Sequence, residues 1–179
     1  MRGFFGIGVE GIHKAQNVGS LVRSAHAFGA SFFYTVSPAL NVQDIKYSDT
    51  SGAFDHLPYY EYRSIEEFEL PQACQLVGVE FLPDAVELPS FRHPTRAAYI
   101  LGPEMGSLSP AALERCDHII KIPMKFCINV GVAGALVMYD RLISLGRHAA
   151  RPVKAGGPTE GLPEPVHGRM RYIAGEKAE

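Results

Sequence analysis

Three short segments of the sequence combine glycines with polar side chains that can bind or polarise a ligand. The first runs from Asn17 to Arg23, the second from Leu101 to Ser109, and the third from Ile122 to Ala133. Asparagine and arginine donate hydrogen bonds, glutamate accepts them, and glycine lets the backbone approach a ligand closely. Each segment falls where a predicted strand gives way to a loop or a helix, and open α/β sheets bind ligands at such places. The ordered set therefore predicts one ligand site built from distant parts of the chain.

Apolar runs between turn-forming residues predict the elements that position these segments. Near-continuous apolar strands are typical of parallel sheets covered on both faces, and helices are expected at amphipathic periodicity or capping residues. The predicted strands are residues 4–9, 31–36, 75–79, 97–101 and 118–122. The predicted helices are residues 15–28, a short helix opened by the capping box Ser64–Glu67, residues 109–115 and residues 130–145. This alternation indicates an α/β domain with a mostly parallel sheet flanked by helices.

The composition is that of an ordinary globular protein. The chain has 179 residues and a formal net charge of −2, so it can bury a core, and its overall charge does not attract nucleic acid. An RNA substrate would need a local basic patch. No apolar run is long enough to span a membrane, the N-terminus lacks a signal-peptide stretch, and the three cysteines have no paired spacing. We expect a cytoplasmic protein with reduced thiols and no membrane contact. The spacing of the seven histidines also predicts no metal site.

Two parts of the chain lack regular periodicity. Residues 37–60 form a long polar connection, which in a compact domain is usually functional or mobile. From Arg147 onward the sequence is rich in proline and glycine. We therefore predict a folded domain over residues 1–147 and a partly disordered tail over residues 148–179. The basic residues of this tail leave two interpretations open, contact with RNA phosphates or simple solvation.

Gly6, Gly8 and Gly11 have the spacing G-x-G-x-x-G of dinucleotide-binding loops. In such proteins the glycines follow a strand, open a helix and precede an acidic residue about 20 positions later. Here only five residues precede the first glycine, and residues 29–33 contain no Asp or Glu. We interpret these glycines as part of a crowded first strand. A nicotinamide-dependent enzyme is therefore the disfavoured alternative.

The three polar segments resemble the three motifs of the SpoU/TrmH family of SPOUT methyltransferases. The motifs read Asn17-x-Gly19-x-x-x-Arg23, then Leu101-Gly102-Pro103-Glu104-x-Gly106-x-Leu108, then Ile122-Pro123-Met124 followed by Asn129-Val130-x-Val132-Ala133. Their order and spacing match over residues 5–145. The third motif usually has a serine where this chain has Cys127, and a thiol is a weaker hydrogen-bonding group than a hydroxyl. Binding that depends on this serine is expected to be weaker or differently arranged here.

Members of this family transfer a methyl group from S-adenosylmethionine to a ribose 2′-oxygen of tRNA or rRNA. The resemblance therefore implies that residues 1–147 are a catalytic domain with a C-terminal deep trefoil knot. It also implies a homodimer with its active site near the subunit interface, and an RNA substrate, for which we expect tRNA rather than rRNA. The implied catalytic residues are Arg23, Asn17, Glu104 and Asn129, and the implied cofactor-binding residues are Val79, Leu101, Gly102, Gly106, Ile122, Met124 and Cys127.

The role of Arg23 is limited by the chemistry of its side chain. A guanidinium stays protonated in proteins and cannot act as a base. We expect Arg23 to grip the adjacent phosphate and to stabilise negative charge on the 2′-oxygen, while a phosphate oxygen or water takes the proton. For Asn17, Glu104 and Asn129 a purely structural role stays open beside the functional one. For the whole chain the alternative is a non-catalytic RNA-binding relative, because Cys127 replaces the usual serine.

Overall fold

The computed structural model describes residues 3–39 and 52–158. The chain divides into two compact units, Met1–Gly146 and Arg147–Glu179. Residues 147–158, the described part of the second unit, form no helix or strand, and most of the predicted tail lies outside the described residues. Within the described ranges, none of the helices combines the length and apolar character needed to cross a bilayer.

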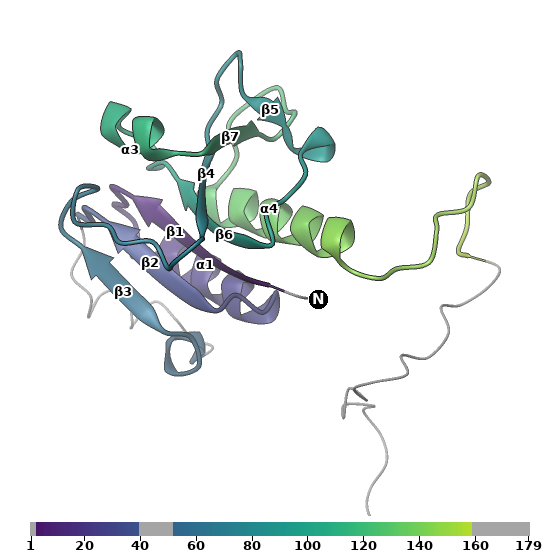
Figure 1. Ribbon diagram of the computed structural model, residues 1–179, viewed down its shortest axis with the longest axis horizontal. Coiled ribbons are helices and arrows are strands. Elements are labelled where there is room, and N and C mark those ends of the chain that lie inside the picture. Colours follow the sequence, from purple (N-terminus) through teal and green to yellow (C-terminus); the bar gives the residue numbers. More distant parts are fainter. Residues whose placement is uncertain (1–2, 40–51, 159–179) are drawn as a thin grey trace, which may run out of the picture. The chain divides into compact units, whose positions relative to one another are not determined.

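Strands and helices alternate along the first unit (Figure 1). The strands are β1 (Phe4–Glu10), β2 (Phe32–Val36), β3 (Tyr59–Tyr62), β4 (Gln75–Val79), β5 (Val86–Glu87), β6 (Arg96–Leu101) and β7 (His118–Lys121). The helices are α1 (Ala15–Ala27), α3 (Pro110–Arg115) and α4 (Val130–Leu145), with short 3₁₀ turns η1 (Ala53–Asp55) and η2 (Leu88–Ser90). The five predicted strands and three of the predicted helices are confirmed.

The strands form one sheet in the order β3-β2-β1-β6-β4-β7-β5, and every pairing in it is parallel. The prediction of a mostly parallel α/β sheet is therefore confirmed. The chain runs from β1 to β2 and β3 in one half of the sheet and then crosses to the other half, which contains β4 to β7. The order of the strands therefore reverses between the neighbouring strands β1 and β6. Because all strands run in the same direction, the loops that follow them gather at one edge. The fold therefore assembles the polar segments at its carboxyl edge.

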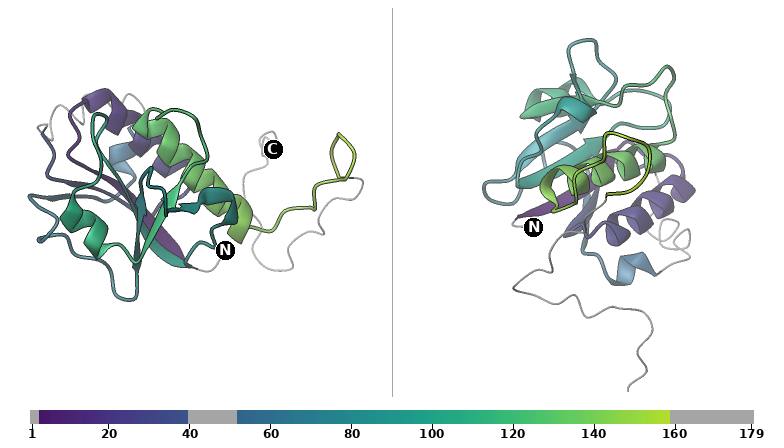
Figure 2. Two further views of the ribbon diagram at one scale, coloured as in Figure 1. Left: turned by 90° about the horizontal axis from the view of Figure 1, so that it is seen from above. Right: turned by 90° about the vertical axis from the view of Figure 1, so that its right-hand side faces the viewer.

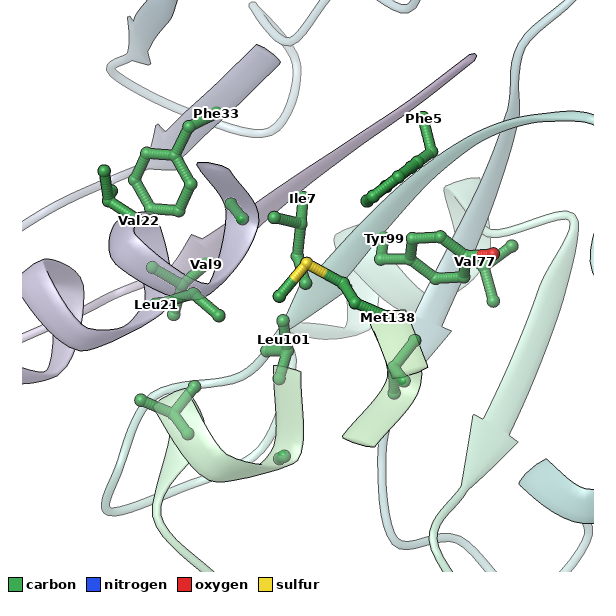
Figure 3. Packing of buried hydrophobic residues seen from close by; sticks show 14 of the residues in the cluster. Phe5, Ile7, Val9, Leu21, Val22, Phe33, Val77, Tyr99, Leu101 and Met138 are labelled. Carbon is green, nitrogen blue, oxygen red and sulfur yellow. The ribbon is translucent and has the colours of Figure 1, made fainter. Parts of the chain in front are cut away.

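Each face of the sheet is covered by its own apolar cluster, because strand residues alternate between faces. On one face α1 and α4 pack against β1, β2 and β6, as the two views of Figure 2 show for the helices. Figure 3 shows Leu21 of α1 and Met138 of α4 beside Ile7 of β1. On the other face, a second apolar cluster packs α3 against the sheet, and it includes Ile100 and Leu108. Both faces are thus buried, as near-continuous apolar strands predict.

The two long helices approach each other closely at Gly134. A Cβ atom at this position would lie 2.2 Å from Leu21 Cδ1. Gly6 and Gly8 are likewise confined, since a Cβ atom on either would lie within 2.3 Å of Phe32 or Tyr34. The prediction of a crowded first strand is confirmed for Gly6 and Gly8, which lie inside β1. It is wrong for Gly11, which follows the strand with a φ of 62° and has ordinary space around it.

Two further details of the sequence prediction are wrong. The capping box Ser64–Glu67 opens no helix, because Ile65 and Phe68 are both drawn into the core and their carbonyl oxygens accept hydrogen bonds from the Arg115 guanidinium. A segment this short cannot offset the unfavourable nucleation of a helix against such contacts. The connection predicted over residues 37–60 ends too late, because it contains η1 and the beginning of β3, a strand that was not predicted. Residues 40–51 of this connection lie outside the described residues.

A buried polar cluster joins α4 to the start of β6. His93 lies between two partners, with Nδ1 at 2.6 Å from the Tyr99 hydroxyl and Nε2 at 2.9 Å from Asp140 Oδ2. Arg141 is 1% exposed, and its guanidinium donates to the carbonyl oxygens of Pro94 and Thr95 and to the Tyr99 hydroxyl. This cluster lies at the amino ends of the strands, so it holds the fold together away from the carboxyl edge.

The cluster makes the stability of the fold depend on pH. Burial lowers the pKa of His93 below its ordinary value of 6.5, although Asp140 acts in the opposite direction. The unfolded chain therefore binds this proton more readily than the folded chain. The stabilisation is complete above about pH 6.5 and is lost as the pH falls from there through the lower folded-state pKa. We expect the melting temperature to drop between about pH 7.5 and about pH 5.5, and to drop less in His93→Gln. Equal drops in His93→Gln and in the control His148→Gln, at an exposed residue of the second unit, would contradict this assignment.

Candidate functional site

A cavity of about 420 Å³ opens at the carboxyl edge of the sheet. Its walls come from the segments that follow β4, β6 and β7 and from the first turns of α1 and α4. Cavities of this size are typical of sites for small organic ligands, and the carboxyl edge beside a reversal of strand order is where open α/β sheets bind them. The three polar segments singled out in the sequence therefore meet at one cavity.

All residues predicted to bind a cofactor line this cavity: Val79, Leu101, Gly102, Gly106, Ile122, Met124 and Cys127. Glu80, which follows Val79, also lines it, as expected from its place at a strand end. Several lining residues were not predicted to belong to the site, among them Lys14, Phe81 and Ala133. Phe81 directly follows Glu80 at a strand end, Lys14 directly precedes α1, and Ala133 lies one turn into α4, so these positions were the signals that sequence reasoning did not use.

Three of the predicted catalytic residues form one hydrogen-bonded chain on the cavity wall. Asn17 Nδ2 donates to Glu104 Oε1 at 2.7 Å, and Asn129 Nδ2 donates to Asn17 Oδ1 at 2.8 Å. Asn129 Oδ1 in turn accepts from the backbone N–H of Gly131 at 2.8 Å, which caps the start of α4. The chain thus fixes the relative positions of the loop after β6 and the first turns of α1 and α4.

Glu104 is held as a carboxylate. Partial burial raises its pKa, but hydrogen bonds from its own N–H, from Asn17 and from the backbone N–H groups of His13 and Lys14 outweigh burial and lower the pKa below 4.5. A charged carboxylate accepts strongly from the Asn17 amide and fixes which end of that amide faces Asn129. The charge of Glu104 therefore orients the whole chain of side chains.

Two further carboxylates anchor the far end of the loop that follows β6. Glu80 Oε2 accepts from the backbone N–H of Leu108 at 2.7 Å. Glu10, which is only 7% exposed, accepts from the backbone N–H of Ser109 at 2.8 Å and from its hydroxyl at 2.7 Å. Ser109 Oγ also accepts from Ala112 N and caps α3, as its sequence predicts. These hydrogen bonds attach the loop after β6 to β1 and to the segment after β4, and β1 and β4 are the strands on either side of β6.

Arg23 is placed differently from the other predicted catalytic residues. It lies on α1 almost two turns beyond Asn17, its side chain is exposed, and it is not among the residues that line the cavity. The residues around it adjoin α4: a Cβ atom on Gly131 would lie 3.1 Å from Ser20 Cβ, and the Phe28 ring packs on Tyr139. Arg23 therefore lies on the exposed surface of α1, while Ser20 and Phe28 of the same helix adjoin α4.

No three His, Cys, Asp or Glu side chains of the described residues are grouped so as to hold a metal ion. The carboxylates and amides at the cavity form hydrogen bonds with backbone groups and with each other.

A parallel α/β sheet with a small-molecule cavity at its carboxyl edge defines a ligand-binding protein of the open-sheet class. The model of the SpoU rRNA Methylase family matches residues 5–139. The chain therefore belongs to the SpoU rRNA Methylase family, and the resemblance stated from the three motifs is confirmed.

Relatives with assigned activities share about a quarter of their residues with this chain. The tRNA (guanosine(18)-2′-O)-methyltransferase of Escherichia coli K12 is 25% identical over 138 residues, which are 74% of this chain and 60% of that protein. The 23S rRNA (guanosine-2′-O-)-methyltransferase RlmB of Nitrosomonas europaea is 26% identical over 141 residues, which are 74% and 53% of the two chains. The chain thus spans little more than half of these relatives' length.

A solved structure shows the same fold with a ligand. The SpoU methyltransferase AviRb from Streptomyces viridochromogenes, in complex with the cofactor AdoMet, superposes with a TM-score of 0.72 and 25% sequence identity. The superposition covers 82% of this chain and 60% of that protein.

Proposed function

We propose that this protein is an S-adenosylmethionine-dependent methyltransferase that methylates a ribose 2′-oxygen of RNA, with tRNA as the expected substrate. The observation that carries the proposal is the meeting of all three family motifs at one cavity, although they come from distant parts of the chain. Relatives acting on tRNA and on rRNA both support an RNA substrate. Residues 1–147 are proposed to be the catalytic domain.

The residues at the cavity suit S-adenosylmethionine. Apolar side chains of Val79, Leu101 and Ile122 offer a surface for adenine, while the carboxylates of Glu80 and Glu104 favour a ligand that carries positive charge. Lys121 also reaches the cavity, but its ammonium group donates to the carbonyl oxygens of Leu82 and Pro83. When bound, S-adenosylmethionine supplies an activated methyl group on a sulfonium centre.

The chain's own residues then prepare the ribose. Asn17 and Asn129 present fixed amide groups at the cavity wall, where they can position a ribose hydroxyl. Arg23 grips the neighbouring phosphate and stabilises the negative charge that develops on the 2′-oxygen. The hydroxyl proton leaves to a phosphate oxygen or to water, since a guanidinium cannot accept it.

The exposed position of Arg23 supports a homodimer in which the arginine of one copy serves the cavity of another. Val132, Leu136 and Tyr139 form an apolar stripe along α4, and each is between 40% and 52% exposed. The stripe lies on the helix that packs against α1, the helix that carries Arg23. A second copy that covers the stripe would bring its own Arg23 surface close to this cavity, as expected for a two-fold contact.

The trefoil knot implied by the resemblance belongs to the same proposal. After β7 in one half of the sheet, the chain passes the cavity and returns as α4 to pack on α1 over the other half. A knotted C-terminal segment requires, beyond this crossing, that the chain pass through one of the loops at the carboxyl edge.

The proposed function is tested by two measurements on the full chain. Calorimetry with S-adenosylmethionine is expected to show binding that is lost in Gly102→Val, because a side chain there meets Leu108 N at 3.0 Å. Gly157→Val, at a glycine with no neighbour within 4 Å, is the matched control. Incubation with unmodified tRNA and rRNA, followed by nuclease digestion and mass spectrometry, is expected to yield a 2′-O-methylnucleoside. No binding at millimolar cofactor would favour a non-catalytic RNA-binding protein instead.

Removal of the Glu10 carboxylate is expected to weaken cofactor binding although Glu10 does not line the cavity. Glu10→Ala leaves both hydrogen-bonding groups of Ser109 without this acceptor and loosens the loop after β6. Since hydrogen bonds to charged groups contribute about 1.5–3 kcal/mol, we expect an affinity loss of about tenfold or more. Glu10→Gln keeps an acceptor and should retain most of the affinity. A loss of equal size in Glu114→Ala, at an exposed residue of α3, would contradict this role.

A further inference from the structure

Two phenylalanines differ from all others in the chain by their exposure. Of the ten phenylalanines, only Phe81 and Phe126 are exposed, at 53% and 83%. A phenylalanine left in water forgoes about 1.5–3 kcal/mol of burial free energy. Phe81 lines the cavity, and Phe126 belongs to the segment between Met124 and Cys127, two residues that line it, although Phe126 itself does not. Exposed aromatic surface gathered at a binding cavity indicates contact with a ligand.

Two exposed lysines belong to the segments around the cavity. Lys125 precedes Phe126 and is exposed, and the exposed Lys14 lines the cavity. A ring beside ammonium groups suits single-stranded nucleic acid, because a base stacks on the ring while the phosphates contact the lysines. In a chain with a net charge of −2, contacts with RNA phosphates depend on such local lysines.

We propose that Phe126 is a stacking platform for an unpaired base of the RNA substrate, beside the nucleotide whose ribose enters the cavity. The proposal rests on the proposed function for the nature of the substrate. A nucleotide that leaves its helix loses stacking with its neighbours, and an aromatic ring at the entrance replaces part of that interaction. Phe126 thereby favours riboses in unpaired segments over those within a duplex.

The chain has no tryptophan, so one introduced indole is its only such fluorophore. The emission of Phe126→Trp is expected to be quenched when unmodified in vitro transcribed tRNA is added, because a stacked base contacts the indole. Tyr60→Trp is the matched control: this residue of β3 is 50% exposed and does not line the cavity. Its emission should stay unchanged over the same titration.

Affinity gives the second readout. By fluorescence anisotropy with labelled tRNA, Phe126→Ala is expected to bind about 5–150-fold more weakly, since stacking contributes about 1–3 kcal/mol per base. Phe126→Tyr should retain the affinity. S-adenosylmethionine affinity, measured by calorimetry, should stay within about twofold in both variants because the ring projects into solvent.

The outcomes separate this proposal from the proposed function. RNA binding with quenched Phe126→Trp emission but no methyl transfer would overturn the enzyme and keep the platform. Methyl transfer with unquenched emission, or unchanged RNA affinity in Phe126→Ala, would overturn the platform and keep the enzyme. A Phe126→Ala protein that loses a wild-type dimer in ultracentrifugation but binds RNA normally would assign the ring to a contact between copies, which also overturns the platform.

Discussion

Replacing Arg23 with alanine is expected to lower the rate of methyl transfer to RNA by about 100-fold or more, which is the effect of removing one donor that stabilises a developing oxyanion. Affinity for S-adenosylmethionine should stay nearly unchanged, because Arg23 does not line the cavity that is proposed to hold it. Single-turnover methylation of tRNA and calorimetric titration of the cofactor measure the two effects separately.

Two variants give this expectation its controls. Arg23→Lys should recover only part of the rate, since an ammonium group cannot form the paired hydrogen bonds of a guanidinium to phosphate. Arg92→Ala removes an exposed arginine that precedes β6, at the opposite edge of the sheet, and should leave the rate unchanged. If Arg23→Ala lost cofactor affinity and rate to the same extent, Arg23 would have a structural role and not a catalytic one.

Replacing Arg141 with alanine is expected to destabilise the fold by about 2–5 kcal/mol, because it leaves a cavity and removes the donor from buried carbonyl groups. The guanidinium is buried against Phe5 and Tyr99, at 5.1 and 6.0 Å from the ring centres. It also satisfies the carbonyl oxygens of Pro94 and Thr95, which would be left without this donor. Urea unfolding followed by circular dichroism measures the loss.

Arg141→Met separates packing from charge in the same site. Methionine refills part of the volume, so this variant should lose less stability than Arg141→Ala. The exposed control Arg92→Ala should remain within about 0.5 kcal/mol of the wild type. An Arg141→Ala protein as stable as Arg92→Ala would show that the buried guanidinium contributes nothing net to folding.

The parts of the fold that could be predicted are those in which local pattern and tertiary packing agree. The five predicted strands are apolar on both sides and lie inside the sheet, and Ser109 and Asn129 cap helices as their positions indicate. The helix expected from Ser64 does not form, because side chains of this segment are buried in the core and a carbonyl oxygen accepts a hydrogen bond from Arg115. A local sequence pattern contains no information about these tertiary contacts. Strand β3 was missed because none of its four residues at the sheet edge is buried, so the segment gives only a weak apolar signal.

The site could be predicted as far as its residues follow strand ends. Val79, Leu101 and Ile122 each end or follow a strand, so parallel topology alone brings them together. The hydrogen-bonded chain of Glu104, Asn17 and Asn129 depends on distances across more than 80 positions of sequence, which spacing does not encode. Glu10 gave no signal, because its role arises only once β1 and β6 adjoin.

We propose that Arg23 of one copy and the cavity of another form one active site. Co-expression of Arg23→Ala with Gly102→Val, each expected to be inactive alone, is a test of this shared site. Mixed dimers would contain one complete site, so randomly assorted subunits should recover about a quarter of the wild-type methylation rate. A co-expressed pair that stays as inactive as either variant alone would contradict the shared site.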